Sequence, residues 1–391
     1  MRLVAKFGGT SLATGDRIDR AADSIAKVVG DGHEVVVVAS AMGSTTDDLL
    51  EEINFEAEVA DVAEIVSMGE RTSVRMLKAA LTARGVASRF LEPGCADWPI
   101  IVDEAGEVDR DATTTRTAAL ATTLADGVPV VTGFLAEGPD GEVTTLGRGG
   151  SDTTAVMLGR YLDADQVVIV TDVEGVMTGD PRAVEGARNV GEITVDELRS
   201  LSFRGAEVVA PSALAYKTDD FEVRVLHYQH PDLLTGGTDI VGQFENLIDM
   251  RERPLSCLTV AGRAIRNSPG ILARLASALG DHDVNIDVAS SGLDSVTFYV
   301  DTDSDDEAES ILHEQVIEND ALSSVTVDGP AAVIRVTGEI DQTGVITAIL
   351  DALSAAEIGV NDVITSATSV AVFVDWPQRE AALARIQAAF D

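Results

Sequence analysis

LVAKFGGTS, at residues 3–11, is a short apolar run that ends at two adjacent glycines and leads into a helical pattern. EVVVVAS at residues 34–40 and QVVIVTD at residues 166–172 are runs of the same kind, rich in valine and isoleucine. Helical patterns separate these runs along the chain. Continuous apolar strands between helices indicate a mainly parallel sheet that is covered on both faces. In such sheets, ligands bind beyond the carboxyl ends of the strands.

The pattern changes in the last third of the chain. Residues 256–328 read β-α-β-β-α-β, and a second copy starts at AAVIRVTG, residues 331–338, but stops before its last strand. Gly270 and Gly344 open the first helix of the two copies, so this part of the chain is an internal repeat. Because an incomplete sheet would leave an open edge, we expect a strand near residues 244–250 to supply the missing pairing.

The chain has 391 residues, which is long enough for two or three domains with separate apolar cores. We predict an α/β domain with a mainly parallel sheet between helices, followed by two α+β modules of the ferredoxin-like type. The predicted boundaries place the α/β domain at residues 1–243. They place a linker strand with the first module at residues 244–328 and the second module at residues 329–391.

The composition is strongly acidic, with a formal net charge of −38 and lysine at four positions among 28 basic residues. Such a surface repels nucleic-acid phosphates and anionic lipids, which argues against both as partners. One acidic binding face is the alternative, but charges spread along the whole chain favour a solubilised surface in a high-salt cytoplasm. Cys95 and Cys257 have neither disulfide nor metal-ligand spacing, and no segment approaches the length of a membrane span. We therefore predict a reducing, cytoplasmic location.

KFGGTS, at residues 6–11, stands where a strand ends and a helix follows. Gly8 and Gly9 have no Cβ, so their backbone N–H groups can approach a phosphate, and Lys6 adds a compact positive charge. A glycine pair after a strand is often an ordinary turn. Lysine is scarce in this chain, however, and its presence in this loop favours phosphate binding.

LGRGGSDTTA, at residues 146–155, has three glycines before a predicted helix. Arg148 can bind a carboxylate through two parallel hydrogen bonds. A plain N-cap role for Ser151 or Asp152 is the alternative, but it leaves an arginine between glycines unexplained. VIVTDVEGVMTGDPR, at residues 168–182, places a glycine-punctuated loop after a buried strand, which suits nucleotide recognition or simply a series of turns.

These segments resemble the aspartate kinases of the amino-acid kinase family. KFGGTS, SAMGSTTD at residues 40–47, SMGER at residues 67–71, LGRGGSD and TDVEGVMTGDPR stand in that family's order and approximate spacing. The C-terminal repeat resembles the family's tandem ACT domains. The resemblance covers essentially the whole chain. It implies phosphorylation of the aspartate side-chain carboxylate to 4-phospho-aspartate, the first step in the synthesis of lysine, threonine and methionine.

The resemblance also implies roles for individual residues. The implied catalytic residues are Lys6, which would neutralise the transferred phosphoryl group, and Asp152, which would organise the lysine. Aspartate would be held by Ser40, Thr46, Glu70, Arg148 and Ser151, with the arginine on the α-carboxylate and the glutamate on the ammonium. ATP would be bound by Lys6, Phe7, Gly8, Gly9, Thr171, Asp172, Met177, Asp180 and Arg182. Local turn bonding is the alternative for Ser40 and Thr46, and a charged position on an amphipathic helix is the alternative for Glu70.

Catalysis of this kind needs positioning and charge neutralisation more than acid–base chemistry, because a carboxylate is already ionised at neutral pH. The implied cofactors are ATP and Mg²⁺, with the metal bound through the ATP phosphates and not by protein ligands. One departure from the family's pattern is the segment GAEV at residues 205–208, where Glu207 replaces a lysine that usually approaches the phosphates. A carboxylate there would bind a cation, turn away, or alter nucleotide use.

In the ACT-like repeat, the resemblance implies amino-acid effector sites where modules join edge to edge. The implied contact residues are Asn267, Leu272, Asn285, Ile286, Asp287 and Asn361. Local backbone bonding explains the asparagines nearly as well. Pro269 of the first copy is replaced by Thr343 in the second, so the two copies need not bind equally. We expect threonine or lysine as feedback inhibitor, and a homodimer or higher homo-oligomer formed through these modules.

Two other functions are open from the sequence. A kinase of the same fold would act on glutamate, acetylglutamate or a nucleoside monophosphate, but such kinases generally lack a tandem ACT tail and the SMGER segment. A non-catalytic amino-acid sensor with a degenerate kinase domain is the second alternative, and Glu207 is its best support. The sequence does not identify the effector, the oligomer size or the salt requirement.

Overall fold

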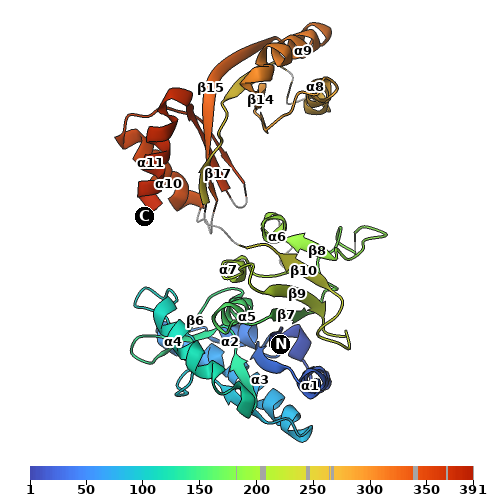
Figure 1. The fold of residues 1–391 in the computed structure, drawn as a ribbon, viewed down its shortest axis with the longest axis vertical. Helices are drawn as coiled ribbons and strands as arrows, with labels where there is room; N and C mark the ends of the chain where they lie inside the picture. Colours follow the sequence, from blue (N-terminus) through green and yellow to red (C-terminus); the bar gives the residue numbers. More distant parts are fainter. Residues whose placement is uncertain are drawn as a thin grey trace. The chain divides into compact units, whose positions relative to one another are not determined.

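The computed structural model describes residues 1–181, 183–202, 208–243, 247–263, 265, 268–337, 342–366 and 369–390. The chain forms two compact units, Met1–Phe244 and Glu245–Asp391 (Figure 1). Three residues singled out above, Arg182, Glu207 and Asn267, lie outside the described residues. No helix in the described part of the chain is long and apolar enough to cross a membrane.

The first unit is built on an eight-stranded sheet with the order β3-β4-β2-β1-β7-β9-β10-β8. Neighbouring strands in this order are parallel, except that β9 and β10 are antiparallel. The prediction of a mainly parallel sheet is therefore confirmed. The strands are β1 (Arg2–Phe7), β2 (Glu34–Ala39), β3 (Ser88–Leu91), β4 (Val128–Thr132), β7 (Gln166–Thr171), β8 (Glu192–Thr194), β9 (Glu222–His227) and β10 (Thr238–Val241).

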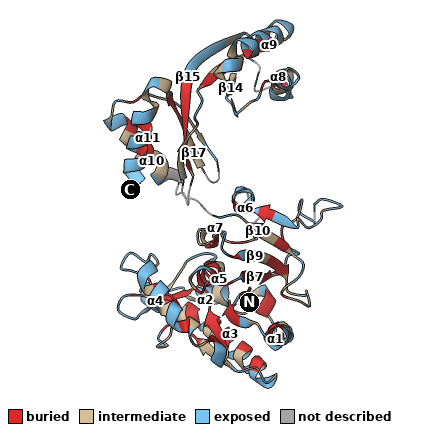
Figure 2. Cartoon of the chain, viewed as in Figure 1, coloured by how far each residue is buried: buried red, intermediate tan, exposed pale blue. Residues whose placement is uncertain are grey.

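Helices cover both faces of this sheet, which explains why its central strands are continuous apolar runs. Side chains of β1 alternate between two cores, with Leu3 and Ala5 in one and Val4 in the other. Buried residues concentrate on the strands of the sheet (Figure 2). The first core contains side chains of α1 (Gly15–Gly30) and α3 (Val59–Ala83), and the second contains those of α4 (Arg110–Ala121), α5 (Gly150–Tyr161), α6 (Val195–Ser202) and α7 (Pro211–Leu214). The unit also contains α2 (Thr45–Glu52) and a small hairpin, β5 (Leu135–Glu137) and β6 (Val143–Thr145).

The second unit contains one seven-stranded sheet, with β13-β14-β12-β15-β17-β16 in order and β11 paired to β15. β15 (Ser324–Thr337) is a 14-residue strand that ends the first repeat and begins the second. β11 (Leu247–Met250) pairs antiparallel with the part of β15 that belongs to the second repeat, so the strand expected to complete that repeat is present. The other strands are β12 (Leu255–Ala261), β13 (Val288–Ser291), β14 (Ser295–Asp301), β16 (Val360–Thr365) and β17 (Ser369–Asp375).

Two helices pack on each half of this sheet, as the ferredoxin-like prediction requires. Side chains of α8 (Ile271–Gly280) and α9 (Asp305–Glu318) form a core with the first repeat. Those of α10 (Gln342–Ala355) and α11 (Arg379–Phe390) form a separate core with the second repeat. The predicted fold class, an α/β domain followed by two α+β modules, is therefore confirmed.

The two halves of the second sheet face each other. In the sheet order, β12 and β15 lie between β14 and β17, which in a flat sheet would separate these two strands by about 14 Å. The rings of Tyr299 on β14 and Phe373 on β17 nevertheless stack with their centroids 4.0 Å apart. The Tyr299 hydroxyl also donates a hydrogen bond to Asp362 on β16 (3.1 Å). The sheet must therefore bend around β15 so that its helix-free faces meet.

Replacing Phe373 by alanine should destabilise the second unit by about 3–5 kcal/mol, because it removes a fully buried ring from the contact between the sheet halves. Hydrogen exchange in peptides from β17 should accelerate, while exchange in β1 stays unchanged. Phe390→Ala is the matched control, since Phe390 is 40% exposed and its loss should have little effect. Unchanged exchange in β17 of the Phe373 variant would show that this contact does not hold the halves together.

Candidate functional site

A cavity of about 730 Å³ lies in the first unit, where the carboxyl ends of β1 and β2 meet the start of α5. Three signals found far apart in the sequence meet here: the KFGGTS loop, the SMGER helix and the LGRGGSD loop. All seven residues predicted to act in catalysis or to hold the amino acid line it, namely Lys6, Ser40, Thr46, Glu70, Arg148, Ser151 and Asp152. The strand-end position agrees with where α/β sheets bind ligands.

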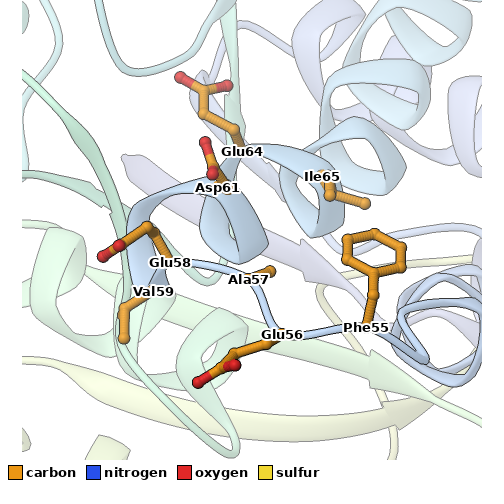
Figure 3. A pocket seen from close by; sticks show the side chains of 8 residues that line it. All are labelled: Phe55, Glu56, Ala57, Glu58, Val59, Asp61, Glu64 and Ile65. Atoms are coloured by element: carbon orange, nitrogen blue, oxygen red, sulfur yellow. The ribbon is translucent and has the colours of Figure 1, made fainter.

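A second cavity, of about 650 Å³, lies beside the first and shares Ala57 and Val59 with it. It is formed by one segment, residues 55–65, in which Phe55 lies beside Ile65 (Figure 3). Its charged lining residues are all carboxylates, from Glu56, Glu58, Asp61 and Glu64. Carboxylates repel phosphate and carboxylate ligands, so the cavity that contains Lys6 and Arg148 is the candidate site.

Lys6 and Asp152 form an ion pair at the base of the site, with Lys6 Nζ 2.6 Å from Asp152 Oδ1. Lys6 is the second-to-last residue of β1, and Asp152 lies in the first turn of α5. The other carboxylate oxygen, Oδ2, accepts a hydrogen bond from the Ala210 N–H (3.2 Å). The N-cap of α5 is Gly149, so the alternative reading of Ser151 or Asp152 as a plain N-cap is wrong.

The two glycines after Lys6 do different things. The Gly8 N–H donates a hydrogen bond to the Val170 carbonyl oxygen (3.0 Å) and is therefore already engaged with β7. The Gly9 N–H has no partner among the described residues. A Cβ on Gly9 would lie 2.8 Å from the Gly43 carbonyl oxygen, so close loop packing also requires this glycine. In this conformation the amide available to a phosphate is that of Gly9, and the expectation that Gly8 also donates is corrected.

Glu70 is 3% exposed in the middle of α3. Its Oε1 accepts a hydrogen bond from the Ala41 N–H (3.2 Å), while Oε2 is buried without a partner among the described residues. Burial raises the pKa of Glu70 to about 7, against the opposing effect of hydrogen bonds from Ala41 and Thr46. Gly69 permits this placement, because a Cβ there would lie 2.7 Å from the Ala41 Cβ. The free oxygen is suited to accept hydrogen bonds from an ammonium group.

Arg148 stands between two glycines, Gly147 and Gly149, that both have a φ of 72°. This left-handed backbone is readily adopted by glycine, and it presents the arginine from a tight loop. The Arg148 side chain is exposed and forms no hydrogen bond or ion pair with the described residues. The guanidinium is therefore available for a ligand carboxylate at the edge of the cavity.

Several lining residues escaped prediction from the sequence. The most informative are Val66, Phe134 and Thr145. Phe134 has a φ of 69°, which is unusual for a bulky residue, and it follows the carboxyl end of β4. Its place directly after a predicted parallel strand is the signal that could have identified it.

Most of the residues expected to bind the nucleotide do not line the cavity that contains Lys6. Phe7 is 2% exposed and packs in the core beneath α1 and α3, so its side chain cannot reach a nucleotide. Thr171 ends β7 and donates a hydrogen bond to Asp172 (3.3 Å), which is exposed. Met177 and Asp180 follow in the same loop. These positions lie along the carboxyl end of β7, the strand next to β1, outside the lining of the cavity that contains Lys6.

The expected effector residues lie on different elements of the second unit. Leu272 is 41% exposed on α8, whereas Ile286 packs against the core of the first repeat. Asp287, just before β13, forms an ion pair with Arg251 (3.1 Å). Asn361 on β16 donates a hydrogen bond to Asp375 (3.0 Å). Asn285 lies two residues before Asp287 in the sequence.

No cluster of three or more His, Cys, Asp or Glu side chains that could hold a metal ion occurs in the described part of the chain. The site offers instead one ammonium and one free backbone N–H, from Lys6 and Gly9, which are donors suited to phosphate oxygens. Mg²⁺ that arrives with a nucleotide is compatible with this donor set, because such an ion takes most of its ligands from phosphates and water.

Comparison with known proteins gives a consistent result over both units. The sequence model of the amino acid kinase family matches residues 1–227, and that of an ACT domain matches residues 258–316. The aspartokinase of Pseudomonas aeruginosa is 31% identical over 404 residues, covering 100% of this chain and 97% of its own. The crystal structure of aspartate kinase from Synechocystis has a TM-score of 0.82 at 28% identity and covers 100% of this chain and 69% of that chain.

Escherichia coli aspartokinase III is also similar, in two states. Its complex with aspartate and ADP has a TM-score of 0.56 at 24% identity and covers 100% of both chains. Its complex with lysine and aspartate has a TM-score of 0.53 at 25% identity and covers 99% of this chain and 98% of that chain. The likeness in fold therefore extends through both units of the chain.

Replacing Glu70 by glutamine should make stability less dependent on pH. The pKa of Glu70 rises from 4.5 to about 7 on folding, so between these values the folded chain binds more protons than the unfolded chain. Raising the pH through this window should therefore lower the free energy of unfolding of the wild type relative to the variant, by about 3 kcal/mol above pH 7. Urea denaturation of both proteins across this pH range measures the difference.

Glu51→Gln is the control for this experiment, since Glu51 is exposed on α2. Its difference from the wild type should stay nearly constant with pH. A pH-independent difference for the Glu70 variant would contradict the raised pKa.

Proposed function

Because the chain belongs to the aspartate kinases of the amino acid kinase family, we propose that it transfers the γ-phosphoryl group of ATP to the side-chain carboxylate of aspartate. The product would be 4-phospho-aspartate. The observation that carries this proposal is that Lys6, Glu70 and Arg148 line a single cavity. An ammonium, a carboxylate and a guanidinium together match a phosphoryl group, an amino group and a carboxylate.

In the proposed complex, Arg148 binds the α-carboxylate of aspartate and Glu70 accepts hydrogen bonds from its ammonium group. Both roles use groups that have free capacity, the unpaired guanidinium and the buried Glu70 Oε2. Ammonium binding would favour the ionised form of Glu70 and offset the effect of burial on its pKa. Ser40, Thr46 and Ser151 would add hydroxyl contacts around the substrate.

The reaction requires no removal of a proton from the acceptor, because the aspartate side chain is already ionised at neutral pH. One of its oxygens attacks the γ-phosphorus, a new P–O bond forms, and the bond from this phosphorus to the oxygen bridging to ADP breaks. Lys6 stabilises the negative charge that develops on the phosphoryl oxygens, and the Gly9 N–H can donate to them. Asp152 holds the ammonium in place through its 2.6 Å contact.

The nucleotide would extend from this point along the carboxyl end of β7. Mg²⁺ bound through the ATP phosphates would neutralise charge on the phosphoryl group when it is present. The proposed nucleotide contacts of the described residues are Lys6, Gly8, Gly9, Thr171, Asp172, Met177 and Asp180. Gly8 would contribute its small size, since its N–H is engaged with Val170.

We propose that the second unit carries feedback regulation by threonine or lysine and joins two copies of the chain. The sheet order ends at β13 on one side and at β16 on the other, and each of these strands pairs with one neighbour. Such edges can pair with strands of another chain. Edge-to-edge joining would bring Asn285 and Asp287, next to β13, close to Asn361 on β16 of a second copy. The reaction that is regulated, formation of 4-phospho-aspartate, would be the first step in the synthesis of lysine, threonine and methionine.

ATP-dependent formation of an acyl phosphate, trapped as a hydroxamate by hydroxylamine, tests the proposed function. Aspartate should react, whereas glutamate, acetylglutamate and nucleoside monophosphates should not. Lys6→Ala should lower kcat by about a hundredfold or more, since it removes a charge that acts on the transferred group. Lys78→Ala is the matched control, because Lys78 lies on α3 away from the cavity lining, and it should retain activity.

If another carboxylate reacts and aspartate does not, the proposed substrate is wrong and that carboxylate takes its place. Absence of hydroxamate with every substrate, from folded protein, would favour a non-catalytic sensor. Repeating the assay with threonine and with lysine tests the proposed regulation. Inhibition by neither, in an active preparation, would contradict it.

We further propose that the protein works in the cytoplasm of a cell with a high internal salt concentration. Its formal net charge is −38, and repulsion among carboxylates destabilises the folded state unless it is screened. Raising KCl from about 0.1 M to about 1 M shortens the screening length from roughly 10 Å to roughly 3 Å. The melting temperature should rise over this range, and a fall would contradict the proposed adaptation.

A further inference from the structure

The second unit contains a cavity of about 320 Å³ in which both halves of the bent sheet take part. One side of its lining comes from Leu255 and Val288 of the first repeat, and the other from Val333, Ile364 and Ala371 of the second. The volume is within the range of cavities that bind small molecules. The small core around Tyr299 and Phe373 is formed partly by the same residues.

Strand alternation explains why charged residues enter this space. On β15, Ala332, Ile334 and Val336 point into the core beneath α10 and α11, so Val333 and Arg335 lie on the opposite, helix-free face. On β11, Ile248 and Met250 pack against the same helical core, which places Asp249 on the helix-free face as well. Asp249 and Arg335 both line the cavity.

These two charged residues have unused binding capacity. They stand directly opposite each other in the pairing of β11 with β15, yet no ion pair joins them. Asp249 Oδ1 is buried without a hydrogen-bond partner among the described residues. Arg335 is exposed and forms no hydrogen bond or ion pair within the described chain. A buried carboxylate oxygen without a donor costs about 1–3 kcal/mol, which a ligand donor would recover.

A nearby arginine is not available in the same way. Arg251 also lines the cavity, but its guanidinium donates hydrogen bonds to Asp287 (3.1 Å) and to both carboxylate oxygens of Asp301 (3.2 Å each). Three carboxylate contacts satisfy this side chain. It forms part of the wall, and among the described residues that line the cavity the free cation is that of Arg335.

We propose that this cavity binds a small zwitterion with an apolar side chain, such as an aliphatic amino acid. The ligand's carboxylate would bind Arg335, and its ammonium group would donate to Asp249 Oδ1. The side chain would lie against Val288, Val333 and Ile364. A cationic side chain such as that of lysine is disfavoured, since it would lose hydration against an apolar wall.

This site shares Asp287, whose carboxylate is paired with Arg251, with the effector positions proposed above, but Asn285 and Asn361 are not part of its lining. Those positions, at Asn285 and Asn361, depend on a second copy of the chain. The cavity between the sheet halves is formed within one chain, by β11, β12, β15 and the strands around them. Ligand binding there therefore needs neither an active kinase site nor a dimer.

Isothermal titration of the full-length protein without ATP tests the proposal. The probes are L-valine, L-leucine and L-isoleucine, with L-lysine for comparison. We expect at least one aliphatic amino acid to bind with one site per chain and more tightly than lysine. For leucine, 4-methylpentanoate lacks the ammonium and 3-methylbutylamine lacks the carboxylate, and each should bind at least about tenfold more weakly.

Asp249→Asn and Arg335→Gln should each weaken this binding by about tenfold or more. Ala371→Leu should also weaken it, by filling the cavity while both charges remain. Asp351→Asn on α10 and Arg385→Gln on α11 are matched controls, since both residues are exposed on the outer helices, and they should bind as the wild type does. Circular dichroism checks that each variant folds.

Three results would overturn the proposal. The first is no binding of any of the three aliphatic amino acids to the wild type. The second is binding that Asp249→Asn, Arg335→Gln and Ala371→Leu all leave unchanged. The third is binding that Asn361→Ala abolishes and the cavity variants retain, which would assign the ligand to the edge-to-edge site. None of these results depends on whether the chain phosphorylates aspartate.

Discussion

The ammonium of Lys6 and the carboxylate of Asp152 meet 2.6 Å apart, with 11% and 14% of their side chains exposed. Removing either charge would leave the other largely desolvated and unpaired, which typically costs about 3–5 kcal/mol. The pair joins the end of β1 to the start of α5. The Ala210 N–H donates a hydrogen bond to Asp152 and so connects the segment before α7 to the same contact. The cavity is arranged around this contact, because β1 is a central strand and α5 carries the loop that presents Arg148.

Close backbone packing gives the rest of the site its shape. Gly9, Gly69 and Gly133 each stand where a Cβ would lie within 3 Å of another segment. Gly133 allows the end of β4 to contact Ser151, and Gly69 allows α3 to approach Ala41. These approaches bring Glu70 into an environment where its carboxylate is buried. The raised pKa of Glu70 is thus a consequence of packing that glycine makes possible.

The second unit is held together by contact between two halves of one bent sheet. Its sheet bends at β15, and aromatic stacking between Tyr299 and Phe373 closes one part of the space between the halves. Another part remains open and contains Asp249 and Arg335. An apolar contact between the two repeats therefore lies beside two charged side chains that form no ion pair with each other, and this is the arrangement on which the proposed ligand site rests.

The amino-acid sequence by itself predicted the mainly parallel sheet, the repeated modules and the strand that completes the second repeat, and its resemblance to the aspartate kinases implied seven of the residues that line the main cavity. It could do so because strand and helix periodicity is local, and because glycine-rich loops at strand ends mark ligand sites. Only the tertiary structure decided that Gly8 is engaged with β7, that Phe7 faces the core, that Gly149 caps α5 and that Asp249 faces a cavity opposite Arg335. Each of these depends on which distant segments pack together, and periodicity within one segment carries no information about its neighbours in space.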